Sequence, residues 1–364
     1  MSKLIVVDAR MVGPEEHGIA RYVVQTAEGL SKIENRPYEL RFIVSPGYDQ
    51  EFLKRGFEVI REDAPFLHPL EMIRIPSLLR AHGASLYHSM SFSSLVRCPC
   101  PWIMTLHDLC HLSYGGFLQR LYYNRILKPF ATHARQLITV SEFSKREISL
   151  WLRKPLSSIE VVYNAMDKSL LEEKKDEVVQ AILAKYELEP KKYFFSVSSP
   201  KAHKNLPLVA RAYRKFRKSV ERPWPLALKG GKTVRGRGIR NLGWLSRLEL
   251  EVLMSEAGAF IFPSLYEGFG RPPVEAALAG APVICSSIAP LEECLQDLSH
   301  DEAVFVDPMD MAAWVDALTL GFRNQISRPS AESRRKILMR YSVENLGNEM
   351  DRIYRGVLLK GQNE

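Results

Sequence analysis

The chain has 364 residues, of which 46% are hydrophobic and 25% are charged, and its formal net charge is +8. This length predicts two domains rather than one core, and the composition is that of a globular protein. The sequence has no run of about eighteen apolar residues, which excludes a membrane-spanning helix. Its five cysteines are scattered, which argues against a disulfide framework. The N-terminus is a poor signal peptide, so we expect a cytoplasmic protein.

The first part of the chain alternates buried strands with amphipathic helices. Apolar runs predict strands, and a helical stripe of apolar residues predicts the helix at 18–33. The strands are expected at 3–9, 39–46, 84–90, 101–108, 134–141 and 157–167, with a further helix at 141–153. This order is typical of an α/β doubly wound parallel sheet.

The same pattern then restarts, which predicts a second sheet of the same kind. Helices are expected at 169–188, 205–220, 245–257 and 272–280, and strands at 192–199, 224–231, 258–264 and 281–287. We place the boundary near Lys168, giving domains at 1–168 and 169–345, followed by a C-terminal helix at 346–364.

Two glutamates flank a glycine-rich turn in the stretch from Pro263 to Ser286. The buried strand before this turn should end at a sheet edge, where ligands bind in such folds. Gly268 and Gly270 allow a ligand to approach the backbone, and the helix that follows offers free N–H groups. Carboxylates such as Glu267 and Glu275 can accept hydrogen bonds from the hydroxyls of a sugar or ribose. The segment therefore indicates a site for a phosphorylated, hydroxyl-rich ligand.

Basic residues are concentrated in two regions. Residues 190–248 hold sixteen Lys or Arg and a single acid, Glu221, and residues 109–141 hold no acid. Two anionic contacts are therefore expected. A nucleic-acid-binding protein is one alternative, although no nucleic-acid motif or aromatic stacking platform accompanies the charge.

The spacing of Glu267 and Glu275 resembles the E-x7-E motif of retaining GT-B glycosyltransferases, especially glycosyltransferase family 4. The resemblance covers nearly the whole chain, including segments that are similar to the family's glycine loop, histidine strand end, diphosphate loop and nucleotide-binding core: 8–22, 104–108, 196–213 and 242–280. It implies the GT-B fold, in which two Rossmann-like domains face each other across a cleft, with the C-terminal helix crossing back to the first domain. An epimerase or a glucan phosphorylase is a further enzyme alternative, but the lysine motif of a phosphorylase is not found.

The resemblance also assigns roles to individual residues. Glu275 is expected to bind the ribose and Glu267 the transferred sugar, while Lys204, with Lys201 or His203, neutralises the diphosphate. His107, Glu267 and Lys204 form the expected catalytic set, and His107 and Asp108 lie on the acceptor side. Arg271 and Ser198 depart from the family pattern, which commonly has a leucine-like residue and a glycine there. The remaining expected donor contacts are Gly18, Gly243, Leu245, Gly268, Phe269, Gly270 and Arg271.

The function implied is transfer of a hexose with retention and without a metal or other cofactor. Mannose from GDP-mannose is the preferred donor, and a UDP-sugar is the alternative. The acceptor is expected to be a saccharide or a lipid-linked sugar in cell-surface polysaccharide, lipopolysaccharide or glycolipid synthesis, with no nucleic-acid partner. The basic amphipathic segment 117–136 has two open interpretations: peripheral contact with an anionic membrane on its cytoplasmic face, or an ordinary surface helix.

Overall fold

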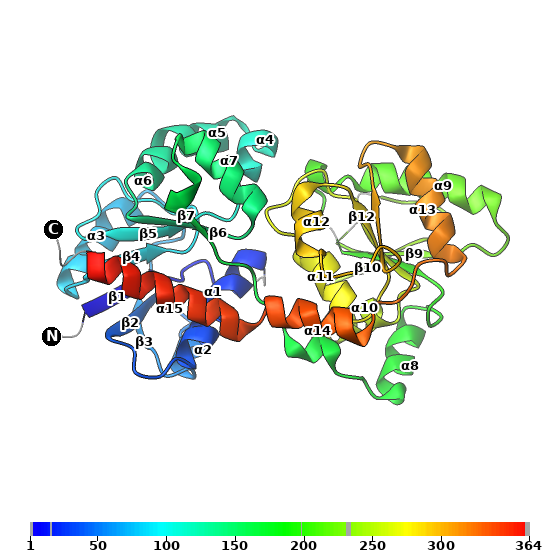
Figure 1. Cartoon of the computed structure of the whole chain (residues 1–364), viewed down its shortest axis with the longest axis horizontal. Helices are drawn as coiled ribbons and strands as arrows, with labels where there is room; N and C mark the ends of the chain where they lie inside the picture. The colour runs from blue at the N-terminus through cyan, green and yellow to red at the C-terminus, as the bar shows by residue number, and fades with distance from the viewer. Residues whose placement is uncertain (1–2, 15–16, 198, 231–233, 361–364) are drawn as a thin grey trace. The chain divides into compact units, whose positions relative to one another are not determined.

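The computed structural model describes residues 3–14, 17–197, 199–230 and 234–360, and Ser198 lies outside them. The chain forms two compact units (Figure 1). Unit 1 comprises Met1–Ala165 with Tyr341–Glu364, and unit 2 comprises Met166–Arg340.

Unit 1 is built on a seven-stranded sheet in the order β3-β2-β1-β4-β5-β6-β7. Every strand pairing is parallel, so the carboxyl ends of all strands lie at one edge. Most of these strands are almost fully buried because helices cover both faces of the sheet, as parallel sheets require (Figure 1). The strands are β1 (Lys3–Asp8), β2 (Tyr38–Val44), β3 (Glu58–Arg61), β4 (Leu86–Ser89), β5 (Trp102–Thr105), β6 (Gln136–Thr139) and β7 (Ile159–Val161).

The helices of unit 1 pack their apolar stripes on this sheet. In α1 the buried stripe contains Tyr22, Val23 and Leu30, as the 18–33 periodicity predicts. The basic segment 117–136 forms two short helices separated by a π-helical stretch, rather than one regular helix. The helical elements are α1 (Gly18–Ser31), α2 (Gln50–Leu53), α3 (Glu71–Ala81), α4 (Cys110–Tyr114), α5 (Phe117–Tyr122), η1 (Tyr123–Leu127), α6 (Lys128–Thr132), α7 (Glu142–Leu152), η2 (Leu156–Ser158) and α15 (Val343–Lys360).

The C-terminal helix α15 belongs to unit 1, where it lies along α1. Gly29 and Gly347 meet at the crossing, and a Cβ added at Gly347 would lie 2.4 Å from the carbonyl carbon of Gly29. Tyr38 donates to Asp351 at 2.5 Å, and the buried His88 ring is hydrogen-bonded to the Tyr354 hydroxyl at 2.7 Å. These contacts attach the last helix to strands β2 and β4 of the first half of the chain.

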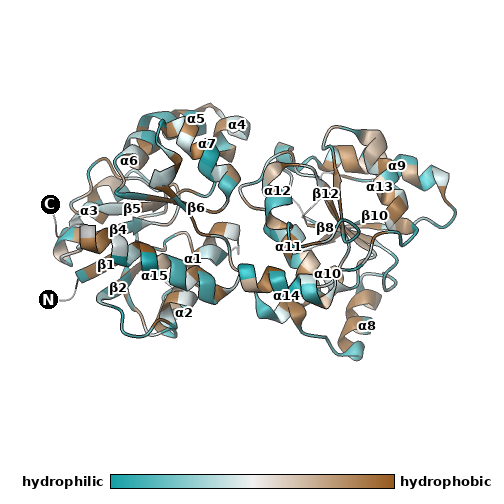
Figure 2. Ribbon diagram, viewed as in Figure 1, coloured by the Kyte–Doolittle hydropathy of each residue, from teal (hydrophilic) through white to brown (hydrophobic). Residues whose placement is uncertain are grey.

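Unit 2 repeats the architecture with six parallel strands in the order β10-β9-β8-β11-β12-β13. The strands lie in apolar surroundings between helices on both faces (Figure 2). The chain order reverses direction across the sheet between β8 and β11, and in such sheets ligands bind beyond the carboxyl ends at this switch point. The strands are β8 (Phe194–Val197), β9 (Leu226–Lys229), β10 (Ile239–Gly243), β11 (Ala259–Phe262), β12 (Val283–Ser286) and β13 (Ala303–Val306).

The core on one face of this sheet is formed by α9 and α13, through buried residues such as Phe216 and Trp314. The helical elements of unit 2 are η3 (Lys168–Leu171), α8 (Asp176–Lys185), η4 (Ala202–Lys204), α9 (Leu206–Ser219), α10 (Arg247–Ser255), α11 (Arg271–Leu278), α12 (Ala289–Cys294), α13 (Met311–Phe322) and α14 (Ala331–Arg340). Two parallel-sheet α/β units are thus present, which confirms the predicted fold class.

Candidate active site

Lys204 lies in the turn that joins β8 to α9. The 3-10 turn η4 ends at Lys204, and Asn205 takes a left-handed conformation with φ +52° before the helix begins. The Asn205 side-chain amide donates to the Pro308 carbonyl at 2.7 Å, which fixes the turn against the loop after β13. Lys204 is therefore held at the carboxyl edge of the sheet, beside the switch point.

Lys204 and Glu267 form an ion pair at this edge. The Nζ of Lys204 lies 2.6 Å from Oε1 of Glu267, with 19% and 14% of the two side chains exposed. The backbone N–H of Leu265 donates to the His203 carbonyl at 2.7 Å, so the loops after β8 and β11 are joined through the main chain as well. The two side chains are partly exposed, so a ligand can reach both charges.

Gly270 shapes the turn between Glu267 and α11. Its φ of +107° is a conformation that side chains rarely adopt, and an added Cβ would lie 2.3 Å from Cδ2 of Leu291. α11 begins at Arg271, and Pro272 and Pro273 occupy its first turn, where a proline is well tolerated. Because these two prolines carry no N–H group, the backbone donors at this helix start are limited to residues before and after them.

The helix expected at 272–280 starts at Arg271, so Glu275 lies in its second turn. It is buried and forms an ion pair with Arg271, whose guanidinium lies 3.3 Å from its Oε1. Glu275 is therefore oriented by a neighbouring cation rather than solvated. Arg271, which departs from the family pattern, is buried as the partner of this carboxylate.

Arg247 is a nearby cation that the sequence reasoning missed. Burial opposes its charged form, but the carboxylates of Glu251, Asp167 and Glu275 outweigh this effect and raise its pKa above the ordinary value. It binds Asp167 and Glu251 at 2.6 Å each, so its charge contributes to the field around Glu275. Arg247 lies in the first turn of α10, and no sequence motif there indicates a role in a site.

The other expected donor contacts in unit 2 follow strands at the same edge. Gly268, Phe269 and Leu245 are buried, whereas Lys201 is exposed and His203 is buried. Gly243 ends β10 with φ +74°. Among the expected contacts the structure pairs Lys204 with Glu267 and Arg271 with Glu275, and Lys201 is more exposed than His203.

His107 follows β5 in unit 1 and is held in a defined orientation. Its Nε2 donates to the Met90 carbonyl at 3.1 Å, so Nδ1 is the unprotonated nitrogen of the neutral ring. Tyr22 of α1 packs edge-on against the ring at 4.9 Å. Burial lowers the pKa of His107 to about 4, and the charge of His17 adds to this effect. The ring is thus neutral at pH 7.

The remaining residues predicted in unit 1 lie close to His107 in the fold. Gly18 is the first residue of α1, directly after His17, whose Nδ1 accepts a hydrogen bond from the backbone N–H of Ala20 at 3.2 Å. Asp108 accepts a hydrogen bond from the backbone N–H of Cys110 at 2.8 Å and so holds the turn into α4. The glycine loop and the histidine strand end therefore meet at one edge of the unit 1 sheet.

In the described ranges, no three His, Cys, Asp or Glu side chains converge as metal ligands would. None of the helices described is both long and apolar enough to cross a bilayer.

The arrangement in unit 2 suits a ligand with phosphates and hydroxyls. A lysine and a helix start present positive charge at one place, and two carboxylates flank them. Phosphate oxygens would accept from the lysine and the N–H groups, while ribose or sugar hydroxyls would donate to the carboxylates.

Both halves of the chain match glycosyltransferase family models. Residues 17–170 match Glycosyltransferase Family 4, and residues 179–337 match Glycosyl transferases group 1. Together these matches cover most of both units.

The chain is also similar to curated relatives and to solved structures. It is 28% identical to the O-antigen chain mannosyltransferase RfbU of Salmonella typhimurium, over 67% of this chain and 66% of that protein. It is 27% identical to the O-antigen chain mannosyltransferase B of Escherichia coli, over 72% of this chain and 70% of that protein. The fold is shared with a glycosyltransferase from Rickettsia africae, with a TM-score of 0.72, 15% identity and coverage of 98% and 99% of the two chains.

WaaG, a glycosyltransferase involved in lipopolysaccharide biosynthesis, has the same fold, with a TM-score of 0.69, 15% identity and coverage of 96% and 99%. The parallel sheets, the two family matches and these shared folds agree with one another. The chain belongs to the GT-B glycosyltransferases, with a Glycosyltransferase Family 4 domain followed by a glycosyl transferases group 1 domain.

Proposed function

We propose that this enzyme transfers mannose from GDP-mannose to a saccharide or lipid-linked acceptor, with retention of anomeric configuration and without a metal. The observation that carries the proposal is the ion pair of Lys204 and Glu267 beside the start of α11. Charge that builds on a departing diphosphate needs positive groups fixed in advance, and a lysine with the backbone N–H groups around Gly270 can supply them.

Each residue of unit 2 takes one role in this proposal. Lys204 and the backbone around Phe269, Gly270 and Arg271 bind the diphosphate and stabilise it as the leaving group. Glu275, oriented by Arg271, accepts hydrogen bonds from the ribose hydroxyls. Lys201 and His203 are second contacts to the phosphates, and Gly243 and Leu245 border the base. Glu267 accepts hydrogen bonds from the hydroxyls of the sugar.

The proposed reaction forms one bond and breaks one bond at the anomeric carbon. The acceptor hydroxyl attacks from the side on which the diphosphate leaves, and a diphosphate oxygen takes its proton. Gly18 lets the backbone approach the phosphates, and Asp108 keeps the acceptor-side turn in place. The neutral ring of His107 accepts a hydrogen bond from a sugar hydroxyl through Nδ1, which positions the sugar.

The choice of mannose rests on the relatives. Two of them are named O-antigen mannosyltransferases, at 28% and 27% identity. A UDP-sugar is the second candidate, because HepE of Anabaena, which shares the fold with a TM-score of 0.73, is described in complex with UDP and glucose. The names of the same relatives support the proposed acceptor class and a role in cell-surface polysaccharide or lipopolysaccharide synthesis.

The proposal includes peripheral contact with the cytoplasmic face of an anionic membrane through residues 117–136. Phe117 and Leu118 of α5 are 78% and 77% exposed, and basic residues lie beside them. An apolar cavity of about 230 Å³ opens next to α5, between its Leu118 and the ring of Phe92. Apolar side chains among cations are typical of a membrane-surface segment.

Incubation with GDP-mannose, UDP-glucose, UDP-galactose and UDP-N-acetylglucosamine, each with a lipid-linked sugar acceptor, tests the proposal. We expect turnover with GDP-mannose, without added divalent cation and in the presence of a chelator. NMR of the product should show the same anomeric configuration as the donor. An inverted product would refute the retaining mechanism. Turnover with a UDP-sugar but not with GDP-mannose would show that the donor is a UDP-sugar.

A further inference from the structure

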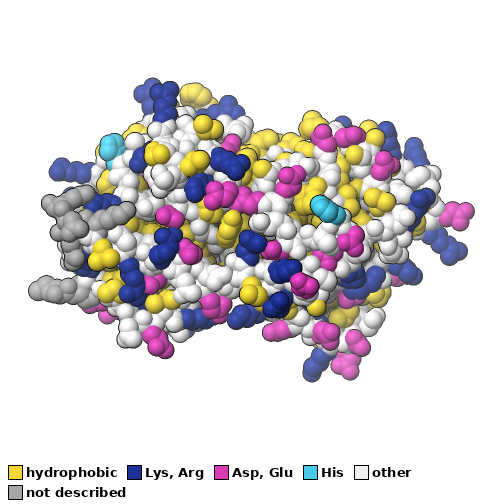
Figure 3. Space-filling view, viewed as in Figure 1, with side chains coloured by type: hydrophobic (Ala, Val, Ile, Leu, Met, Phe, Trp, Pro, Cys, Tyr) yellow, Lys and Arg dark blue, Asp and Glu magenta, His cyan; other side chains and the backbone are white. Residues whose placement is uncertain are grey.

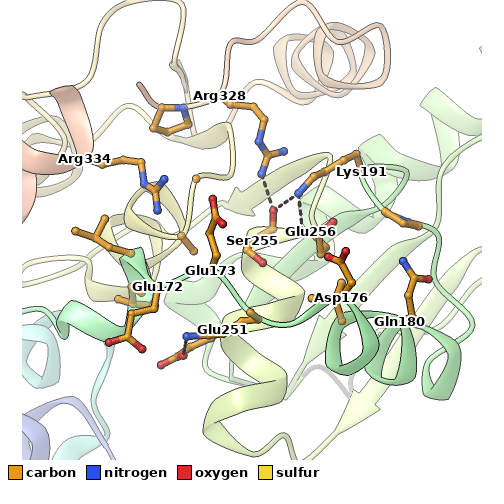
Figure 4. A pocket seen from close by; sticks show the side chains of 18 residues that line it. Glu172, Glu173, Asp176, Gln180, Lys191, Glu251, Ser255, Glu256, Arg328 and Arg334 are labelled. Atoms are coloured by element: carbon orange, nitrogen blue, oxygen red, sulfur yellow. Dashed lines mark hydrogen bonds and ion pairs between the residues drawn. The ribbon is translucent and has the colours of Figure 1, made fainter. Parts of the chain in front are cut away.

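Unit 2 contains a cavity of about 420 Å³ at the edge of the sheet opposite the proposed donor site (Figure 4). Lys191 lines it just before β8, and Gly280 lines it just before β12, so it lies at the amino ends of the strands. Lys204 and Glu267, in contrast, follow the carboxyl ends of β8 and β11. The cavity volume is within the range of about 300–1,000 Å³ that small-molecule sites occupy.

Three cations converge on one wall of the cavity. Arg328 donates to the Ala257 carbonyl at 3.1 Å, and both Arg328 and Lys191 donate to the Ser255 carbonyl. Arg334 donates through Nε to the Leu278 carbonyl at 2.6 Å. These carbonyls, at the ends of α10 and α11, hold the side chains in place. A guanidinium has five N–H donors, so both arginines keep donors for a ligand.

Within the described part of the chain, two of these three cations have no ion-pair partner, although acidic side chains also line the cavity. Lys191 is paired with Glu256 at 2.8 Å, but among the described residues neither Arg328 nor Arg334 forms an ion pair. Burial lowers the pKa of Arg328, and the charge of Arg334 lowers it further, while the charge of Glu256 offsets part of this effect. Burial also lowers the pKa of Arg334, and the charge of Glu173 offsets part of it. Burial likewise lowers the pKa of Lys191, and the positive charge of Arg328 lowers it further. The two arginines can therefore still pair with an anion that enters the cavity.

The opposite wall carries groups that accept hydrogen bonds. Glu173 extends toward Arg334, and the negative charge of Glu173 offsets part of the lowering of this arginine's pKa by burial (Figure 4). Asp176 and Gln180 of α8 lie further along the cavity. Carboxylate and amide oxygens accept hydrogen bonds from hydroxyls. The cavity therefore has a cationic end, where Glu173 also lies, and an end formed by Asp176 and Gln180 that suits a polyol.

We propose that this cavity is a second binding site, separate from the donor site, for a small sugar phosphate. The phosphate lies against Arg328, Arg334 and Lys191, where guanidinium groups can bind it in a bidentate manner. The sugar hydroxyls lie against Glu173, Asp176 and Gln180. The site is independent of the proposed donor and reaction.

Calorimetric titration of the full chain with mannose 6-phosphate, inorganic phosphate and mannose tests this site. We expect mannose 6-phosphate to bind at least tenfold more tightly than phosphate, and mannose not to bind. Arg334→Gln should weaken mannose 6-phosphate binding at least tenfold, whereas the neighbouring exposed Arg335→Gln should leave it unchanged. Equal binding to Arg334→Gln and the wild type, or no binding to the wild type, would overturn the proposal.

Two further variants separate the site from the donor site and from folding defects. Lys204→Ala should bind mannose 6-phosphate as the wild type does, and weakened binding would show that the ligand occupies the donor site instead. Glu173→Gln removes the negative charge near Arg334 and keeps every hydrogen bond of the arginines. It should bind inorganic phosphate more tightly, and unchanged or weaker binding would contradict the cationic end of the site.

Discussion

Lys204 and Glu267 show what single residues of the sequence could and could not reveal. Both were predicted as site residues from their motifs, but their ion pair of 2.6 Å depends on how the loops after β8 and β11 pack. The pair of Arg271 and Glu275 has the i,i+4 spacing of helical ion pairs, a signal that was present in the sequence. Arg247 could not be found, because its neighbours Asp167 and Glu275 are distant along the chain.

Replacing Lys204 tests its role at the leaving group. Because a preorganised cation acts mainly on charge that develops in the transition state, we expect Lys204→Ala to lower kcat by roughly 10²–10³-fold. Lys215→Ala, on the exposed face of α9, is the matched control and should change kcat less than about twofold. Steady-state kinetics with GDP-mannose measures both variants. Equal kcat for Lys204→Ala and the wild type would exclude the leaving-group role.

The buried His107 predicts a loss of stability in acid. Its pKa is about 4 in the folded protein, against 6.5 as the ordinary value, so below pH 6.5 the unfolded chain binds a proton that the folded protein does not. Stability is therefore complete above pH 6.5 and is lost as pH falls toward 4, by at most about 3 kcal/mol from this residue. His107→Gln should lose less unfolding free energy over this range in urea titrations, and an identical pH dependence would contradict the burial of a neutral ring.

At the scale of elements, the sequence predicted the central strands and the edge strand β7, and missed the other edge strands. β3, β10 and β13 all lie at the edge of a sheet and were not expected. β3 and β10 are half-exposed or exposed along most of their length, so they lack the continuous apolar run by which the buried strands were recognised. The helix expected at 272–280 corresponds to α11, because two prolines suit a first helical turn and Gly280 suits the end of a helix.

The crossing of α1 and α15 predicts opposite effects for two glycines in one helix. An alanine Cβ at position 347 would lie 2.4 Å from the backbone of Gly29, which cannot move easily, so Gly347→Ala should destabilise the protein by about 1–3 kcal/mol. Gly356 of the same helix has no atom within 4 Å of an added Cβ, so Gly356→Ala should stabilise by up to about 1 kcal/mol. Thermal and urea unfolding measure both. Similar effects of the two changes would contradict the close packing.

The exposed apolar residues of α5 predict vesicle binding. Phe117→Ser combined with Leu118→Ser should weaken co-sedimentation with phosphatidylglycerol vesicles at least tenfold, because burying each side chain contributes about 1.5–3 kcal/mol. Leu150→Ser is the matched control, since Leu150 is 80% exposed on α7. If the double variant binds vesicles as well as the control does, segment 117–136 is an ordinary surface element.

For the whole molecule, the repeat of the strand–helix pattern was sufficient to predict two doubly wound sheets. The net charge of +8 is less informative, because Lys and Arg are mixed with Asp and Glu over the face shown in Figure 3. In the region 190–248, Arg214 and Arg217 donate to the carbonyls of residues 235 and 237, so part of the positive charge is used within the fold. Composition alone could not distinguish these structural cations from those of a site.

Calorimetric titration with GDP, UDP and ADP tests the central claim most directly, that unit 2 binds a nucleotide sugar through Glu275. We predict that one nucleotide binds the wild type and that Glu275→Gln weakens it at least tenfold, about 1.4 kcal/mol, through loss of a charge-assisted hydrogen bond to the ribose. Glu189→Gln, at an exposed surface position, should leave the affinity unchanged. If no nucleotide binds the wild type, or if Glu275→Gln binds with the same affinity, the account of the donor site is wrong.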